Sequence, residues 1–340
     1  MIALAVALSL PLLGAAPDST IVIRVNQVGY LPDAPKVAVA CGLDSSRVTR
    51  VTRTFVVRDD RGRVAYGPRK VVSTGAFGPC ARTWRLDFSE LRRAGRYRIA
   101  AFGVTSRELR IDAHAYDGGA DTLLYYMREQ RSGWNPLIGD SVHTHDGIVV
   151  DDSGHAGKAV AVSGGWADAS DYLQYVTTSA NATYMMLLAY RDHRDAFADD
   201  FDTRGTPGKN GTPDVLDEAR HGLDWLVRMF PSYGEMYNQV GDDRDHTYFD
   251  LPWTDSSDYG WGKGKERPVY PCTGRPQGLF GNRNRSTGLA STAGKYASAF
   301  SLGAQLFGER DSALADTLRR RALLAFVLGS QNHGVCQTAP

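Results

Sequence analysis

The hydrophobic and polar positions give the chain two different textures. Up to about residue 112, short runs rich in β-branched and aromatic residues, several with alternating polar and apolar positions, are separated by turn-forming sequences such as DDRGR at 59–63. The runs are IVIRV, KVAVAC, RTFVVRD, RTWRLDF and RYRIAAF. Several short strands at this spacing predict a β-sandwich over residues 19–112.

From residue 113 onward the apolar positions recur at helical spacing. The predicted helices span 118–131, 171–192, 212–230, 289–307 and 311–329. The third has the clearest start, because Thr212 suits the N-cap, Pro213 suits the first helical position and acidic residues follow. Long loops, notably 133–165 and 231–287, connect the helices, and such loops in a helical domain usually build a binding cleft.

The first sixteen residues differ from both textures. Residues 2–16 form a short apolar run that ends in small residues, which is typical of a signal peptide and too short for a comfortable membrane span. A buried or disordered N-terminal segment is the alternative. We therefore expect residues 1–16 to be a signal peptide and the protein to be secreted or periplasmic.

Composition and charge narrow the partners. Hydrophobic residues make up 42% of the chain and charged residues 23%, as in an ordinary globular protein. The formal net charge is +1 and no long block of one sign stands out, so neither nucleic acid nor an anionic membrane is an expected partner. A neutral polymer is compatible with this charge balance, although the balance does not select one, and we expect a monomer.

The four cysteines are widely spaced and form no CxxC pair, which disfavours a cysteine-based metal site. Cys41 and Cys80 fall in the same β-rich region and could form a disulfide in an oxidising compartment. Two buried free thiols are an equally good interpretation, and the sequence leaves both open.

Asp168 and Asp171 lie in the run GGWADASDYLQY at 164–175. On one helical turn their β-carbons would be only about 5–6 Å apart. Two carboxylates this close together suit the joint holding of one water molecule. The alternative is a helix N-cap followed by an acidic residue, with no chemical role.

Several stretches together resemble glycoside hydrolase family 9, in the endoglucanase type that has an N-terminal immunoglobulin-like domain. They are IRVNQVGYLPDAPKVAVA at 23–40, SGGWADASDYLQYV at 163–176, NGTPDVLDEARHGLDWLVRM at 210–229, RPVYPCTGRPQGL at 267–279 and RSTGLASTAGKYASAFSLGAQLF at 285–307. The resemblance implies an immunoglobulin-like β-sandwich followed, over 113–340, by an all-α (α/α)6 barrel. About half of such a barrel is expected in this length, as in a member truncated at its C-terminus.

The resemblance also implies a reaction, the hydrolysis of β-1,4 bonds in a β-glucan with inversion. Asp171 is then the general base and Asp168 its water-holding partner, while the general acid, a glutamate, is expected beyond Pro340. Ser170 replaces the glycine that is usual in this motif. Cellulose, mixed-linkage glucan, xyloglucan and chito-oligosaccharides all remain open as substrates.

Aromatic side chains in the long loops are candidates for sugar binding, because the apolar faces of sugars stack on aromatic rings. The candidates are Trp166, Trp253, Tyr259, Trp261 and Tyr270, and Tyr172 and His143 are expected beside them. His145 and Asp146 are weaker candidates for the same surface. Ordinary core packing is an equally good interpretation of each aromatic residue taken alone.

No cofactor is expected. Some family members bind a structural zinc, but Ser132 and the pair Val142–His143 stand at the matching places without thiolates. The loop that precedes the third helix offers carboxylates to calcium, although a solvated acidic loop is the favoured interpretation. These carboxylates belong to Asp199, Asp200, Asp202 and Asp214.

Two other functions are alternatives to hydrolysis. An inactive or carbohydrate-binding fragment is the main alternative, because none of the glutamates considered lies in a motif for the general acid. These are Glu129, Glu218, Glu235 and Glu266. A polysaccharide lyase with the same barrel is disfavoured, since a water-holding aspartate pair suits hydrolysis.

Overall fold

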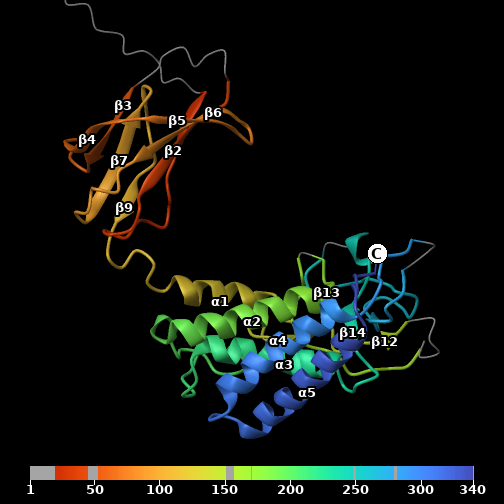
Figure 1. Ribbon diagram of the computed structural model, residues 1–340. Helices are drawn as coiled ribbons and strands as arrows, with labels where there is room; N and C mark the ends of the chain where they lie inside the picture. The colour runs from red at the N-terminus through yellow and green to blue at the C-terminus, as the bar shows by residue number, and fades with distance from the viewer. Residues whose placement is uncertain are drawn as a thin grey trace, which may run out of the picture. The chain divides into compact units, whose positions relative to one another are not determined.

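The computed structural model describes residues 20–44, 53–150, 157–169, 171–247, 250–278 and 282–339 (Figure 1). Two compact units divide between Asp117 and Gly118. The predicted signal peptide at 1–16 and the substitution at Ser170 lie outside the described residues. Among the helices that the structure describes, none has the length and apolar content to cross a membrane.

The first unit contains two antiparallel sheets. One has the order β1 (Ile21–Arg24), β2 (Val37–Gly42), β6 (Cys80–Asp87) and β5 (Val72–Phe77). The other has the order β4 (Val64–Lys70), β3 (Thr54–Asp59), β7 (Gly95–Ala101) and β8 (Val104–Thr105), and β9 (Leu109–Ile111) also pairs with β7. All five predicted strands are therefore confirmed.

The two sheets share one hydrophobic core, as the alternating pattern predicts. Phe55 and Val57 of β3 are buried together with Trp84 and Leu86 of β6, and the residues between them are on the outer faces. The predicted β-sandwich is confirmed.

The described residues of the second unit form five helices, which are α1 (Gly119–Glu129), α2 (Val176–Asp192), α3 (Asp214–Met229), α4 (Ala290–Phe307) and α5 (Ser312–Gln331). Two short 3₁₀ helices, η1 (Arg194–Ala196) and η2 (Asp245–Thr247), lie in the loops. All five predicted helices exist, but two starts differ. Helix α3 begins after Pro213 with no side-chain cap from Thr212, and α2 begins at Val176 rather than at 171.

The prediction that this unit is all-α was wrong in part, because the long loops also form strands. A mixed sheet has the order β12 (Ile148–Val149), β15 (Pro268–Pro271), β14 (Tyr237–Val240) and β13 (Gln174–Tyr175), and β10 (Gly133–Asn135) pairs with β11 (Asp140–Val142). Buried loop backbone needs hydrogen-bond partners, and segments of two to four residues are too short to show a strand period. Figure 1 shows β12, β13 and β14 gathered at one end of the helices.

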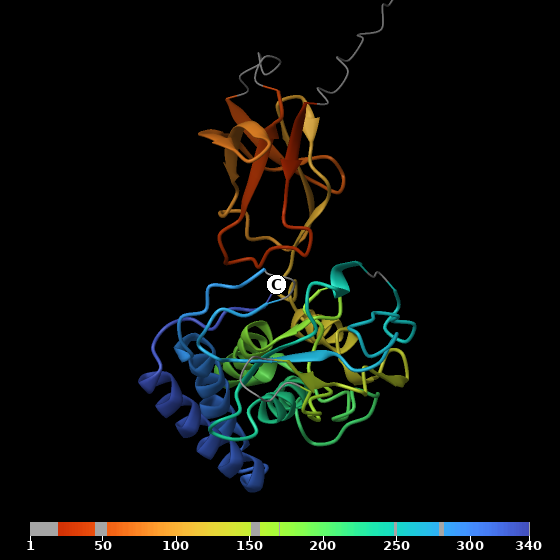
Figure 2. The ribbon, with the colours of Figure 1, turned by 90° about the vertical axis from the view of Figure 1, so that its right-hand side faces the viewer.

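Close packing of the helices depends on two glycines. A β-carbon at Gly222 of α3 would lie 2.2 Å from Thr183 Oγ1 of α2, and one at Gly303 of α4 would lie 2.9 Å from Leu223 Cδ1. Helix α3 therefore packs closely against both α2 and α4, and its Trp225 and Leu226 are fully buried. Figure 2 shows α4 and α5 side by side at one edge of this group.

Both cysteine pairs form disulfides. Cys41 is bonded to Cys80, so the interpretation of two free thiols was wrong. Cys272 is bonded to Cys336, a pair that the sequence did not indicate. The second bond ties the segment after β15 to the C-terminal segment, where Ala339 and Gln239 also exchange two hydrogen bonds.

Replacement of both Cys272 and Cys336 by serine is expected to lower the free energy of unfolding of the second unit by roughly 2–4 kcal/mol, because the bond closes a loop with a sequence separation of 64. Urea unfolding monitored by tryptophan fluorescence measures this change. The double replacement of Cys41 and Cys80 serves as the control and should leave the second-unit transition in place. An unchanged transition in the first variant would contradict the prediction.

Candidate active site

Asp168 and Asp171 lie in a loop rather than on a helix. The Asp168 N–H donates to the Leu173 carbonyl at 2.8 Å, and the chain then enters strand β13, which pairs with β14. These hydrogen bonds delay the start of α2 to Val176. The expectation that the two aspartates share one helical turn at a helix N-terminus was therefore wrong.

The two aspartates nevertheless lie close to one common side chain, the phenol of Tyr175. Burial raises the pKa of Tyr175, and the negative charges of Asp171 and Asp168 raise it further. Asp168 is exposed, whereas the Asp171 side chain is only 15% exposed. Asp171 is thus the more enclosed of the two carboxylates.

His246, in the short helix η2, contacts the Asp171 carboxylate. Its Nε2 lies 2.7 Å from Asp171 Oδ2, and its Nδ1 lies 3.4 Å from Asp243 Oδ1. The imidazole is 48% exposed, so this contact is at the surface of the site. The sequence analysis did not predict His246 or Asp243 as site residues, although the run DDRDH at 242–246 places a histidine among acidic residues.

The residue after Asp171, Tyr172, is fixed at three points. Its N–H donates to Asp245 Oδ2 at 3.2 Å, its carbonyl accepts from the guanidinium of Arg267, and its hydroxyl donates to the Asp250 carbonyl. Backbone held from both sides in this way cannot rotate freely. We infer that this clamp fixes the position of Asp171.

The two partners of the clamp are themselves buried and bonded. Arg267 donates to both oxygens of Asp146 at 2.8 and 2.7 Å and to Gln174 Oε1 at 2.6 Å. Asp245 accepts from the Tyr259 hydroxyl at 3.0 Å. Burial raises the pKa of Asp245, while the charge of Arg267 opposes that rise.

A pocket of about 250 Å³ opens beside Tyr172. His143 lies on its wall, with its ring 5.0 Å from that of Tyr172 and its Nε2 2.9 Å from Asp255 Oδ2. Burial opposes ionisation of Asp255, but hydrogen bonds from His143 and Ser257 outweigh it and hold its pKa at about 2. Asp255 is therefore a carboxylate at every ordinary pH. Other residues around the pocket include Glu129, Ala167, Ala169, Leu251 and Pro252.

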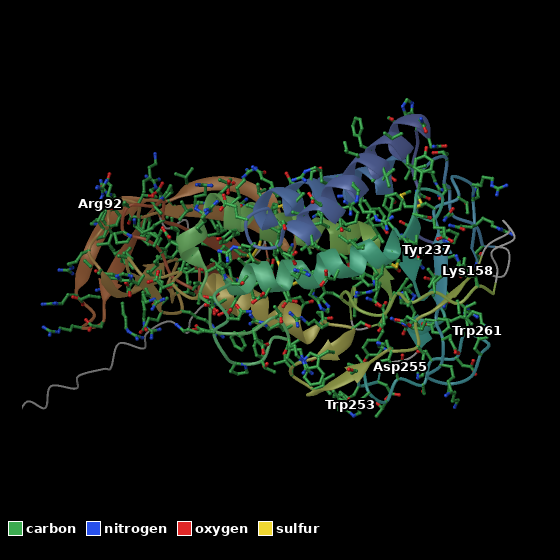
Figure 3. All side chains as sticks on the ribbon, turned by 90° about the horizontal axis from the view of Figure 1, so that it is seen from below. Arg92, Lys158, Tyr237, Trp253, Asp255 and Trp261 are labelled. Atoms are coloured by element: carbon green, nitrogen blue, oxygen red, sulfur yellow. A yellow bond between two sulfur atoms is a disulfide. The ribbon has the colours of Figure 1, made fainter. Side chains whose placement is uncertain are left out.

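The predicted sugar-binding aromatics divide by exposure. Trp253 is 55% exposed and Trp261 is 37% exposed, so both offer surface to a sugar. Figure 3 shows Trp253, Asp255 and Trp261 among the side chains at the loop-rich end of the second unit. Tyr259 and Tyr270 are buried and donate to Asp245 and Asp242, respectively.

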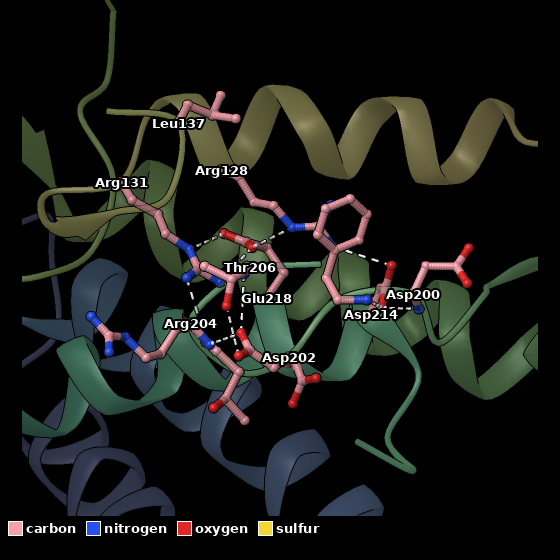
Figure 4. Close-up of polar contacts among 12 residues, drawn as sticks. Arg128, Arg131, Leu137, Asp200, Asp202, Arg204, Thr206, Asp214 and Glu218 are labelled. Atoms are coloured by element: carbon pink, nitrogen blue, oxygen red, sulfur yellow. Dashed lines mark hydrogen bonds and ion pairs between the residues drawn. The ribbon is translucent and has the colours of Figure 1, made fainter. Parts of the chain in front are cut away.

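Trp166 is buried and contributes to the site through packing. Its indole is only 3% exposed, and its N–H donates to Glu218 Oε1 at 2.8 Å. Glu218 in turn accepts two hydrogen bonds from Arg131, at 3.1 and 2.7 Å (Figure 4). This position supports a packing role for Trp166 rather than stacking against a sugar.

The acidic loop before α3 is closed by hydrogen bonds to its own backbone. Asp199 accepts from Asn210 and Gly211, Asp202 from Arg204 and Thr206, and Asp214 from Asp200 and Phe201. Figure 4 shows Asp202 and Asp214 within this network. Its carboxylates are thus occupied by N–H groups, and calcium binding there stays an untested prediction.

Comparison with known proteins gives two family matches. The model of glycosyl hydrolase family 9 matches residues 116–340, and that of the cellulase N-terminal ig-like domain matches residues 18–106. Among solved structures, a metagenome-derived glycoside hydrolase family 9 endoglucanase has a TM-score of 0.68 and 28% identity, over 93% of this chain and 56% of that one.

Curated relatives match over part of their length. Endoglucanase C of Cellulomonas fimi is 31% identical over 71% of this chain and 23% of its own. A xyloglucan-specific endo-beta-1,4-glucanase of Bacteroides ovatus is 31% identical over 64% and 38%, and a cellodextrinase of Butyrivibrio fibrisolvens is 28% identical over 89% and 50%. The chain therefore spans half or less of each of these relatives.

The variant Glu218→Gln is expected to lower the free energy of unfolding of the second unit by about 3–5 kcal/mol, because it leaves the buried guanidinium of Arg131 without its carboxylate. Urea titration measures the change. Glu309→Gln, at an exposed position, is the control and should shift it by less than about 0.5 kcal/mol. Equal shifts in the two variants would contradict the prediction.

Asp217, in the first turn of α3, predicts a pH dependence of stability. Burial raises its pKa to about 6, against the hydrogen bond from Asn210. The folded state therefore binds the proton more tightly than the unfolded state, whose pKa is about 3.9. This contribution, up to about 3 kcal/mol, is present below pH ~4 and is lost as the pH rises through ~6.

Urea unfolding at several pH values tests this dependence in Asp217→Asn, which cannot ionise. Its stability relative to the native chain should rise across that window. Asp224→Asn, on the exposed face of α3, should run parallel to the native chain. Parallel curves for Asp217→Asn would refute the assignment.

Proposed function

Since this chain belongs to glycosyl hydrolase family 9, we propose that it carries the water-activating part of an inverting β-1,4-glucan hydrolase. The observation that carries the proposal is the enclosed carboxylate of Asp171, 2.7 Å from His246 and next to the clamped Tyr172. Its finer fold is proposed to be part of an (α/α)6 barrel.

In the proposed mechanism Asp171 is the general base. Asp168 and Asp171 hold one water, and Asp171 takes a proton from it as the water oxygen attacks the anomeric carbon from the face opposite the leaving group. A second carboxyl must protonate the leaving oxygen. Among the described residues, Glu218 is committed to Arg131 and Trp166 and Glu235 to Lys158, so neither is proposed for that role.

His246 is proposed to keep Asp171 in position for this step. A hydrogen bond to a charged group is worth about 1.5–3 kcal/mol, so it can hold the carboxylate against the nearby charges of Asp168 and Asp243. Tyr175, whose pKa is raised by burial and by the charges of Asp171 and Asp168, is proposed as a hydroxyl donor beside the same carboxylates.

The proposed substrate is a β-1,4-linked glucan of the cellulose or xyloglucan type, in line with the names of the relatives. Trp253 and Trp261 are proposed to stack on sugar rings, because their exposed faces match the apolar faces of the sugars. His143 and Tyr172 are proposed to contact sugar hydroxyls at the pocket beside them.

Secretion to the periplasm or beyond is proposed through the segment at 1–16. The two disulfides support an oxidising compartment. A monomer that needs no resident cofactor is proposed as well.

The variant Asp171→Asn is expected to lower kcat on a β-1,4-glucan by about 10²–10⁴-fold, because it removes the base but keeps the shape of the side chain. Reducing ends released from carboxymethylcellulose and xyloglucan measure the rate. Asp224→Asn is the control and should retain the native rate.

Binding separates hydrolysis from the alternative of a binding-only chain. Asp171→Asn should still bind cello-oligosaccharides in calorimetry, with an affinity within about threefold of the native chain. Binding by the native protein with no release from any β-glucan would favour the binding-only alternative. Full activity in Asp171→Asn would refute the assignment of the base.

A further inference from the structure

The two units carry opposite net charges, although the whole chain is nearly neutral. Residues 1–117 contain 18 basic and 10 acidic side chains, a formal net charge of +8. Residues 118–340 contain 21 basic and 28 acidic side chains, a net charge of −7. The first unit is therefore strongly basic, although the net charge of the whole chain is only +1.

Part of that positive charge is arranged in rows by the strand register. Arg58 of β3 lies opposite Arg98 of β7, and Arg96 of β7 lies opposite Arg110 of β9. Their neighbours along the strands, such as Val57, are buried in the core between the sheets. Because side chains alternate between the faces of a strand, the four arginines share the outer face of this sheet, here called the arginine face.

Acidic residues neutralise this face only in part. Glu108 lies 2.7 Å from Arg96 and 3.5 Å from Arg98, and Asp112 lies 3.8 Å from Arg110. Arg58 donates to the Gly62 carbonyl at 2.9 Å. Four guanidinium groups thus meet two carboxylates.

Such an arrangement is unfavourable for folding alone. Like charges directly opposite each other on neighbouring strands destabilise a sheet. Arg58 and Arg98 form such a pair. A partner that brings anions to this face would convert the repulsion into binding energy.

The chemistry of the face selects the kind of anion. A guanidinium group forms paired hydrogen bonds with a carboxylate, and a rigid sheet presents several such groups at fixed spacing. The outward residues that follow Arg58 and Arg98 along the sheet, Val56 and Ala100, are small and half-buried, so they offer neither a ring to stack on nucleic acid bases nor an anchor for a membrane. A polymer with repeated carboxylates fits this surface best.

We propose that the arginine face binds an acidic polysaccharide, a polymer of uronic acid residues, and so holds the enzyme in a matrix that also contains its neutral glucan substrate. The choice of a polysaccharide among polyanions rests on the proposed function. The second unit, with its net charge of −7, would repel the same polymer, so binding is confined to the first unit.

The test measures binding of the full chain to polygalacturonate by affinity electrophoresis, with gels of dextran, a neutral polymer without β-1,4 bonds, as the reference. The native chain should be retarded by polygalacturonate at low salt and released as salt rises, because exposed charges are screened. The double variant Arg58→Gln with Arg98→Gln should bind about tenfold more weakly, since two charge-assisted contacts are lost.

The matched control is the double variant Arg24→Gln with Arg85→Gln. Both arginines are exposed on the outer face of the other sheet, where Val39 separates them, so the change in net charge is the same. This control should keep at least about half of the native affinity. Circular dichroism melts would verify that both variants are folded.

Three results would overturn the proposal. They are no retardation of the native chain, equal losses in the two double variants, and tighter binding to duplex DNA or to vesicles containing phosphatidylserine than to polygalacturonate. None of these measurements involves hydrolysis. A failure here is therefore distinguishable from a failure of the proposed catalytic role, which the Asp171→Asn rates decide.

Discussion

The organisation of the candidate site depends on the buried guanidinium of Arg267. It joins Asp146 to the carbonyl of Tyr172 and the side chain of Gln174, so that with Arg267 itself three segments that are distant in the sequence meet. Burial opposes its charge, but the Asp146 carboxylate outweighs that effect and raises the pKa of Arg267. Moving any one of these segments would leave the buried guanidinium without a partner, which is costly in free energy. Each segment is therefore held in place by the others.

A second buried ion pair supports the same loop from the other side. Arg131 donates two hydrogen bonds to Glu218, and the indole of Trp166 donates to the same carboxylate. The segment from Trp166 to Tyr172 is thus anchored at both ends by charges that have no access to water. Between these anchors lie the exposed Asp168 and the more enclosed Asp171.

The sequence predicted what depends on local periodicity and failed where the partner is distant. The five predicted strands and five predicted helices exist, because each buries one face or one stripe that repeats along the chain. The start of α2 was misplaced since β13 pairs with β14, more than sixty residues away. Trp166 was predicted to bind a sugar because its hydrogen-bond partner, Glu218 of α3, is distant in the sequence and left no local signal. The bond between Cys272 and Cys336, with a sequence separation of 64, left no local signal.

The loop position of the aspartates changes the electrostatics of the proposed reaction. On a helix start, backbone N–H groups and the helix dipole would stabilise both carboxylates. In the loop, Asp171 depends on a side-chain donor, His246, and lies among other acids that include Asp168, Asp243 and Asp245. Their charges add to the effect of burial in raising the pKa of Tyr175, so its phenol keeps its proton. A neutral hydroxyl beside crowded carboxylates can donate a hydrogen bond without adding charge of either sign to the site.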